Sequence, residues 1–359
     1  MASPRQKILI ISCSGGLGHI RAAEALLENC RELNPEIEVK HIDIANYSGR
    51  FFRAFFVDSY NSIVKYCPQL FKYIYHFADN EKRKKTFNIL LPVLKKSCRK
   101  FFNFVNEFNP DRVICTHFAP PALLNTAEHT YPVDVVVTDY YAHQIWLVPG
   151  VRNLFVPHES IKKELIGKYD GNVVVSGIPI HPRFFKKIND EAVEKKYNLD
   201  PHYPTILFVS GGKGTINTFN TIKQTLDSAK NLNIIAISGK NNPKLFNKLN
   251  KLKSNQNNFK VMRFTDSVDE LMKIADEVIT KPGGLTVSEL LCLKKPMILT
   301  NPIPGQEEKN AEFIMKNNFG FKAQNTADVL EKINLILKHS APLSSPDNSK
   351  NPSEIILQK

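Results

Sequence analysis

The segment "KPGGLTVSELL" (281–291) places Gly283 and Gly284 between an apolar run and the first turn of a predicted helix. Free backbone N–H groups and the positive end of the helix dipole make such a turn an anion site, and glycine lets a phosphate approach the main chain closely. Thr286 could add a hydroxyl donor to the same anion. Thr286 and Glu289 also fit a capping box, in which they only satisfy the helix's own backbone. The segment alone leaves both interpretations open.

A second glycine-rich loop, "SCSGGLGH" (12–19), also follows an apolar run. Gly16 and Gly18 begin the pattern of a dinucleotide-binding loop, but Arg21 stands where its third glycine should be. That glycine permits close packing of helix on strand, so the departure argues against a nicotinamide cofactor. His19 at the start of the next helix can take up a proton near neutral pH, as a general base does. A local helix cap is the alternative for His19.

Further polar residues follow other apolar runs. Asp139 ends "VDVVVTD", and His143 and Trp146 follow in "YYAHQIW". An acid at the end of a strand can orient a histidine or accept a hydrogen bond from a substrate hydroxyl, or it can cap the next turn. Gln306 and Glu307 in "NPIPGQEEKN" combine an amide with a carboxylate, which suits a polyhydroxylated ligand but is also common in ordinary polar loops.

These residues need a scaffold, and short apolar runs alternate with helical patterns along most of the 359 residues. The runs do not alternate polar and apolar residues, which favours parallel strands covered on both faces. The pattern restarts after the polar, proline-punctuated stretch 178–204, and another glycine loop, "VSGGKGT" (209–215), follows the first strand of the second half. We therefore predict an α/β protein of two doubly wound Rossmann-like domains, residues 1–180 and 181–340, followed by a mobile tail, 341–359. Ligands bind beyond the carboxyl ends of such strands, so the glycine loops are expected to line one interdomain cleft.

The net charge of +13 is concentrated, because 12 Lys or Arg and 3 Asp or Glu lie within residues 50–100. Ten aromatic residues lie within 51–77. Aromatic and basic residues together suit a helix that rests on an anionic membrane surface, although a buried aromatic core with a rim of lysines is the alternative. No recognition-helix, RRM or zinc-finger pattern accompanies the charge, so nucleic acid is not the expected partner. The six cysteines show no CxxC spacing and are expected to be reduced core residues of a cytosolic protein. No signal peptide or membrane-spanning run is expected.

Taken together and in order, these segments resemble the MurG-like glycosyltransferases, and most of all the branch of the monogalactosyldiacylglycerol synthases and processive diacylglycerol glucosyltransferases. The pieces that carry the resemblance are "SGGLGHIRAAEAL", "VVVTDYYAHQIW", "VSGIPIHPRF", "LFVSGGKG", "FTDSVDELMKIADEVITKPGGLTVSELLCLKKPMIL" and "NPIPGQEEKNAEFI". The resemblance implies the GT-B fold of family 28 and the transfer of a hexose from a UDP-sugar to a membrane lipid such as diacylglycerol. It also implies inversion at the anomeric carbon, no metal or other cofactor, and a peripheral position on the cytoplasmic face of a membrane.

The resemblance assigns roles to individual residues. His19 would be the base on the acceptor side, supported by Asp139. Glu289 would hold the ribose of UDP, and Gln306 and Glu307 would contact the sugar hydroxyls. The uracil would lie against Phe264 and Val268. The diphosphate would be lined by Gly283, Gly284, Leu285 and Thr286, and from the other side by Gly211, Gly212 and Gly214. The acceptor side would be completed by Gly16, Gly18, His143 and Trp146.

Three other functions remain open from the sequence. A UDP-sugar epimerase of the UDP-GlcNAc 2-epimerase type has the same fold, but it would convert UDP-GlcNAc without a lipid and needs no aromatic and basic surface. A nucleotide- or lipid-binding protein without turnover would not need His19, Thr286, Glu289 and Gln306 together. An NAD-dependent oxidoreductase is the weakest alternative, because the third glycine is missing.

Overall fold

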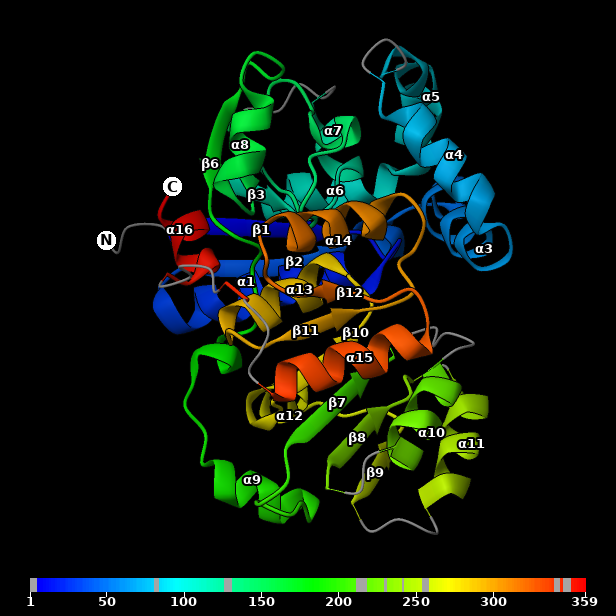
Figure 1. The fold of residues 1–359 in the computed structure, drawn as a ribbon. Coiled ribbons are helices and arrows are strands. Elements are labelled where there is room, and N and C mark those ends of the chain that lie inside the picture. The colour runs from blue at the N-terminus through cyan, green and yellow to red at the C-terminus, as the bar shows by residue number, and fades with distance from the viewer. Residues whose placement is uncertain are drawn as a thin grey trace. The chain divides into compact units, whose positions relative to one another are not determined.

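The computed structural model describes residues 5–80, 84–125, 131–210, 218–228, 231–240, 242–253, 258–338, 343–344 and 350–359, without the side chains of 84–89 and 253. The chain divides into two compact units (Figure 1). Unit 1 consists of Met1–Pro182, Ile303–Asn310 and Ser349–Lys359. Unit 2 consists of Arg183–Pro302 and Ala311–Asn348. The first boundary lies close to the predicted residue 180, but Gln306 and Glu307, which we expected in the second domain, group with unit 1.

Unit 1 is built on a parallel sheet with the strand order β2-β1-β3-β4-β5-β6. Its strands are β1 (Lys7–Ser12), β2 (Glu38–Asp43), β3 (Arg112–Cys115), β4 (Val133–Val136), β5 (Asn153–Val156) and β6 (Asn172–Val175). The helices of this part of the chain are α1 (Leu17–Leu33), η1 (Ile44–Tyr47), α2 (Arg50–Arg53), η2 (Ala54–Asp58), α3 (Ser59–Tyr66), α4 (Pro68–Ala78), α5 (Lys84–Ser97), α6 (Arg99–Phe108), α7 (Ala119–Leu124), η4 (Gln144–Trp146), α8 (Glu159–Leu165) and α16 (Pro352–Gln358).

Unit 2 repeats the plan with the strand order β12-β11-β10-β7-β8-β9, again parallel throughout. Its strands are β7 (Thr205–Val209), β8 (Asn233–Ile237), β9 (Phe259–Met262), β10 (Glu277–Thr280), β11 (Met297–Leu299) and β12 (Phe321–Lys322). The helices that follow unit 1 along the chain are η5 (Pro182–Phe185), α9 (Asp190–Tyr197), α10 (Thr218–Ser228), α11 (Pro243–Lys253), α12 (Val268–Ile274), α13 (Gly284–Cys292), α14 (Gln306–Lys316) and α15 (Thr326–Leu337). The prediction of two doubly wound α/β halves is confirmed.

Strand β1 shows why the apolar runs do not alternate with polar residues. Successive side chains of a strand point to opposite faces of the sheet. Leu9 and Ile11 belong to one buried cluster, whereas Ile8 and Ile10 belong to another. Both faces of the sheet are therefore covered, which requires apolar residues at successive positions in the middle of the strand.

Each sheet has one place where the strand order reverses. In unit 1 it lies between β1 and β3, and in unit 2 between β7 and β10. Loops at the carboxyl ends of such a strand pair form the usual ligand site of a doubly wound fold. The topology thus brings the loop that precedes His19 next to Thr116 and His117, and brings Gly283 next to Ser210.

The prediction of a mobile tail is wrong for its last part. Residues 352–358 form α16, which packs against α1 of unit 1 with Ile356 fully buried (Figure 1). Arg112 donates hydrogen bonds to the carbonyl oxygens of Ile356 (2.7 Å) and Leu357 (3.2 Å), at the end of the helix that lacks intrahelical partners. The sequence of the tail showed one short apolar run, and its contact with Arg112 depends on tertiary structure.

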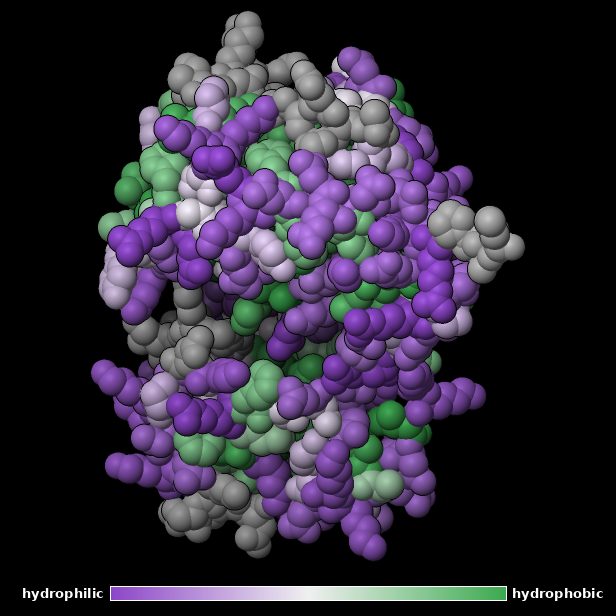
Figure 2. Space-filling view, turned by 180° about the vertical axis from the view of Figure 1, so that it is seen from behind, coloured by the Kyte–Doolittle hydropathy of each residue, from purple (hydrophilic) through white to green (hydrophobic). Residues whose placement is uncertain are grey.

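The face shown in Figure 2 is mostly hydrophilic, with hydrophobic side chains in small groups between polar ones. In the part of the chain that the structure describes, no helix combines the length and the apolar character needed to cross a membrane. All six cysteines are free, and Cys13, Cys30, Cys98 and Cys115 are buried as expected, whereas Cys67 is exposed.

Candidate active site

His19 lies in the first turn of α1 and is held from the neighbouring strand β3. Its Nδ1 lies 2.9 Å from the carbonyl oxygen of Thr116, and the Thr116 hydroxyl donates in return to the His19 carbonyl (2.8 Å). A carbonyl oxygen only accepts hydrogen bonds, so Nδ1 carries the hydrogen and Nε2 keeps a free lone pair. Burial lowers the pKa of His19 to about 4, so the imidazole is neutral near pH 7. The N-cap of α1 is Gly16 without a side-chain cap, so the alternative of His19 as a helix cap is wrong.

The orienting partners of His19 differ from the prediction. Thr138 Oγ1 also lies 2.9 Å from His19 Nδ1, whereas the carboxylate of Asp139 accepts from Gln306 Nε2 (2.8 Å) and Asn310 Nδ2 (3.1 Å). The structure therefore gives the support of His19 to Thr116 and Thr138, and Asp139 is a buried partner of the segment Ile303–Asn310.

This segment is tied to unit 1 by several polar contacts. Asn310 Oδ1 accepts from the backbone N–H of Tyr140 (2.7 Å), and Lys72 of α4 forms an ion pair with Glu308 (3.0 Å). Glu307 is buried and accepts from the backbone N–H of Ile303 through Oε2 (2.8 Å). The structure thus brings Gln306 and Asp139 together, while one oxygen of Glu307 stabilises its own loop.

His143 holds parts of unit 1 together through both of its ring nitrogens. Its Nδ1 accepts from the N–H of Ile145 (3.1 Å), so the hydrogen is on Nε2, which donates to the carbonyl oxygen of Tyr75 in α4 (2.9 Å). Both ring nitrogens are used, which leaves none for an acceptor, and the expectation of an acceptor contact at His143 is wrong. Trp146 is buried and lies beside His19, with 5.8 Å between the ring centroids, so it forms part of the wall around the histidine.

Gly16 and Gly18 of the first loop differ in how much space surrounds them. A Cβ on Gly16 would lie 3.6 Å from Cδ2 of His19, so this glycine borders the imidazole. A Cβ on Gly18 would meet no atom within 4 Å, so the space around Gly18 does not require glycine.

Sequence reasoning missed His117, which is also buried and lies beside His19 with 4.7 Å between the ring centroids. Its position directly after a buried strand was the available signal, because β3 pairs with β1 at the reversal of the strand order.

In unit 2, helix α13 begins directly after the glycine turn that follows β10. Its N-cap is Gly283, with no side-chain hydrogen bond to the helix start, and the first intrahelical bond runs from Val287 N–H to the Gly283 carbonyl (2.9 Å). Thr286 therefore lies inside the first turn and cannot be an N-cap, so the capping-box interpretation is wrong. The backbone N–H groups of Gly284, Leu285 and Thr286 point out of the helix start, as an anion site requires. Glu289 is buried one turn further along.

The other predicted contacts of unit 2 lie at the same edge of its sheet. Phe264 follows β9 and is 44% exposed, and Lys240, which follows β8, places Nζ 5.5 Å from the centre of its ring. Val268, half-buried, begins α12. An exposed ring beside a cation can stack on a flat base. The predicted contacts Gly211, Gly212 and Gly214 lie outside the described residues.

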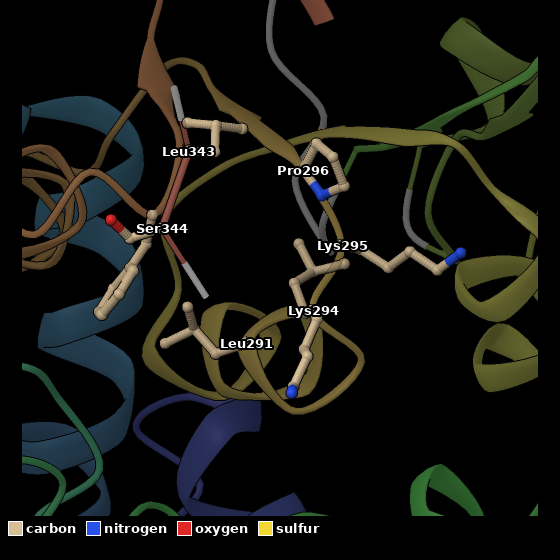
Figure 3. A pocket seen from close by; sticks show the side chains of 8 residues that line it. Leu291, Lys294, Lys295, Pro296, Leu343 and Ser344 are labelled. Atoms are coloured by element: carbon tan, nitrogen blue, oxygen red, sulfur yellow. The ribbon is translucent and has the colours of Figure 1, made fainter. Parts of the chain in front are cut away.

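A separate pocket lies at the opposite end of α13 (Figure 3). It is lined by Leu290, Leu291, Lys294, Lys295, Pro296, Phe319, Leu343 and Ser344. The two lysine side chains point in different directions there (Figure 3). None of the predicted site residues lines this pocket, so the helix start and this pocket are distinct places.

The two parallel sheets and the glycine turns at their edges define the class of this protein. It is a two-domain α/β protein of the GT-B type. Residues 19–180 match the family model described as monogalactosyldiacylglycerol (MGDG) synthase, and residues 205–352 match the glycosyltransferase family 28 C-terminal domain. The chain therefore belongs to the glycosyltransferases of the monogalactosyldiacylglycerol synthase and family 28 type. This membership confirms the resemblance that the sequence motifs carried.

Individual relatives agree with this assignment. The chain is 28% identical over 367 residues to the processive diacylglycerol beta-glucosyltransferase of Bacillus subtilis (strain 168), covering 98% of this chain and 94% of the relative. Among solved structures, Acinetobacter baumannii MurG matches with a TM-score of 0.58, 13% identity and coverage of 99% of this chain and 100% of MurG. A UDP-GlcNAc 2-epimerase from Neisseria meningitidis, bound to UDP-GlcNAc, matches with a TM-score of 0.59, 14% identity and 98% coverage of both chains. Transferase and epimerase share this fold, so the family models, and not the fold, disfavour the epimerase.

Proposed function

We propose that this glycosyltransferase moves a hexose from a UDP-sugar to diacylglycerol or a related membrane lipid, with inversion at the anomeric carbon and without a metal ion. The name of the Bacillus subtilis relative supports the lipid acceptor and the hexose. The single structural observation that carries the proposal is the tautomer of His19. Its Nδ1–H is held by the Thr116 carbonyl, which leaves Nε2 ready to accept a proton.

The reaction needs a base that accepts the proton of the acceptor hydroxyl and a site that stabilises the negative charge of the leaving UDP. The acceptor hydroxyl attacks the anomeric carbon from the face opposite UDP, and its oxygen forms the new bond while its proton passes to His19 Nε2. The bond from the anomeric carbon to the phosphate oxygen breaks, and UDP leaves with the electron pair. A positioned general base contributes about 10²–10⁴-fold in rate.

The start of α13 suits the leaving group. The N–H groups of Gly284, Leu285 and Thr286 and the helix dipole favour the charge that develops on the diphosphate. In this proposal Glu289 holds the ribose, Phe264 and Val268 contact the uracil, and Gly211, Gly212 and Gly214 complete the diphosphate site. Fixed backbone donors supply the electrostatic stabilisation that a metal ion supplies in other transferases.

Two residues of unit 1 are proposed to contact the sugar. Gln306 is anchored on Asp139 through its amide nitrogen, which leaves its carbonyl oxygen as an acceptor for a sugar hydroxyl. Glu307 is buried in the same segment. Asp139 then acts as a positioning residue that fixes Gln306, in place of the predicted contact with His19.

The membrane surface is proposed to meet the outer side of α2–α4. Half of the ten aromatic residues in 51–77 are exposed there, which contradicts a purely core role: Phe51, Phe55, Tyr66, Tyr73 and Phe77. Leu70 and Ile74 of α4 are exposed as well. Lys65 places Nζ 4.6 Å from the centre of the Tyr66 ring, so charge and aromatic surface meet at one place. Apolar side chains with nearby cations bind an anionic bilayer, here the cytoplasmic face of a membrane.

Liposome binding tests this surface. The double substitution Tyr73→Ser with Phe77→Ser should weaken binding to anionic vesicles about tenfold or more, because burial of one large apolar side chain contributes about 1.5–3 kcal/mol. The control is Ile166→Ser, an even more exposed apolar residue after α8. Equal loss for both variants, or no binding by the unaltered protein at low salt, would refute the membrane surface.

The transfer itself is tested with diacylglycerol in anionic liposomes and with UDP-glucose, UDP-galactose or UDP-GlcNAc in separate reactions. We expect one donor to give a lipid carrying one or more hexoses, seen by mass spectrometry, with a β-linkage by NMR and no loss of rate in EDTA. His19→Ala should lose about 10²–10⁴-fold in rate and keep UDP affinity, while the exposed control His202→Ala keeps full rate. Conversion of UDP-GlcNAc without lipid would identify an epimerase, and tight UDP binding without turnover would identify a binding protein.

A further inference from the structure

Three histidines of unit 1 adopt the same local turn. Nδ1 accepts a hydrogen bond from the backbone N–H two residues later in His117 (Ala119, 3.1 Å), His143 (Ile145, 3.1 Å) and His158 (Ser160, 3.2 Å). An imidazole nitrogen that accepts a backbone N–H carries no hydrogen in the neutral ring, so the hydrogen is on Nε2. The turn thus makes each of these rings a donor at Nε2.

The three rings differ in what receives this hydrogen bond. His143 donates to the carbonyl oxygen of Tyr75, and His158 is half-buried. His117 is 3% exposed as a residue, but its Nε2 is not one of the enclosed side-chain atoms that lack a partner in the described part of the chain. A ring N–H that is not sealed inside the core can donate to an incoming ligand.

His117 also lies at the right place for such a partner. Its ring contacts that of His19 edge to face, at 4.7 Å between centroids and 83° between planes. A Cβ on Gly15 would lie 3.7 Å from His117 Nε2 and 3.0 Å from the carbonyl oxygen of Phe56. The missing side chain at Gly15 therefore keeps the space in front of Nε2 free.

The ring cannot serve as a second base. Burial and the neighbouring His19 lower the pKa of His117 well below its ordinary value, and its Nδ1 is already occupied by Ala119. A neutral ring whose N–H is held in one direction is a fixed hydrogen-bond donor. Its matching partner is an oxygen that only accepts, as an ester carbonyl does.

We propose that Nε2–H of His117 binds the ester carbonyl oxygen of the acceptor lipid next to the hydroxyl that His19 deprotonates. This assignment rests on the proposed lipid transferase and adds to it a residue that selects acylglycerols. His117 then orients the acceptor so that its hydroxyl, and not another group, faces His19 Nε2. No bond is made or broken at His117.

The test compares a diacylglycerol with the dialkyl ether of the same chain length, which lacks the ester carbonyls. His117→Asn is the informative variant, because the asparagine oxygen can still accept from Ala119 N–H while the distant donor is lost. His158→Asn is the matched control with the same turn. UDP affinity and Trp146 fluorescence report the integrity of each unit.

We expect the unaltered protein to prefer the ester acceptor in kcat/KM by about threefold to tenfold, the range of one neutral hydrogen bond. His117→Asn should bring this preference close to one, mainly through the KM of the ester, and His158→Asn should retain it. An unchanged preference in His117→Asn, or an equal loss of rate on both acceptors, would overturn the assignment. If the unaltered protein transferred sugar to neither lipid, the proposed function would fail instead.

Discussion

The burial of His19 predicts an unusual dependence of the reaction on pH. The ring is neutral only above its pKa, and burial lowers this pKa to about 4. At pH 5 a histidine of pKa 4 is about 90% neutral, whereas an ordinary histidine of pKa about 6.5 is only about 3% neutral. The fraction of enzyme with a neutral histidine at pH 5 is therefore about 30-fold higher than for an exposed histidine base.

The assay is kcat/KM for the UDP-sugar between pH 4.5 and 8, because this parameter reports the free enzyme. We expect a nearly flat profile down to about pH 5 and a decline below it. Trp146 is the single tryptophan of the chain and lies beside His19, so its fluorescence checks that unit 1 stays folded at each pH. A decline centred between pH 6 and 7 in a folded protein would show that His19 is not buried or is not the base.

Three further predictions concern stability. Glu277 is fully buried without a hydrogen-bond partner for either oxygen among the described residues, and burial raises its pKa from 4.5 to about 8. Between these two pH values Glu277 is ionised in the unfolded chain and protonated in the folded chain, so the free energy of unfolding falls as pH rises, by about 1.4 kcal/mol per pH unit. In urea unfolding followed by circular dichroism, Glu277→Gln should remove this pH dependence. A pH dependence that persists in Glu277→Gln would contradict the prediction. Gly305→Ala should destabilise the segment around it by about 1–3 kcal/mol, because position 305 has φ +84° and the new Cβ would lie 2.9 Å from Cδ1 of Tyr75. An unchanged midpoint of thermal unfolding would refute this prediction. Arg112→Met should release α16, seen as faster amide exchange there, because the carbonyl oxygens of its last turn lose their charged donor at a cost of about 1.5–3 kcal/mol, while Asp134 keeps its ion pair with Arg152; exchange at the original rate would show that other contacts hold α16.

The parts of this structure that were predicted correctly depend on local sequence patterns. Uninterrupted apolar runs such as 206–209 identify buried parallel strands, and the glycines before His19 and after β10 identify the turns at the sheet edges. The parts that were predicted wrongly depend on contacts between distant residues. Thr116 reaches His19 across 97 residues of chain.

The same reason explains the remaining corrections. Asp139 is paired with Gln306, 167 residues away, while its neighbour Thr138 contacts His19. The turn at His143 is local, yet its other nitrogen is used by Tyr75, which no spacing in the sequence indicates. Sequence motifs thus marked the candidate residues, while the partners of each side chain came from the fold.

The most direct test of the central claim is a comparison of the unaltered protein with His19→Ala in liposomes that contain diacylglycerol and one UDP-hexose. We predict glycolipid and UDP in equal amounts from the unaltered protein, and a loss of about 10²–10⁴-fold in His19→Ala with unchanged UDP affinity. Glycolipid formed at the full rate by His19→Ala would contradict the account of the base. No glycolipid from the unaltered protein with any UDP-hexose would contradict the proposed function.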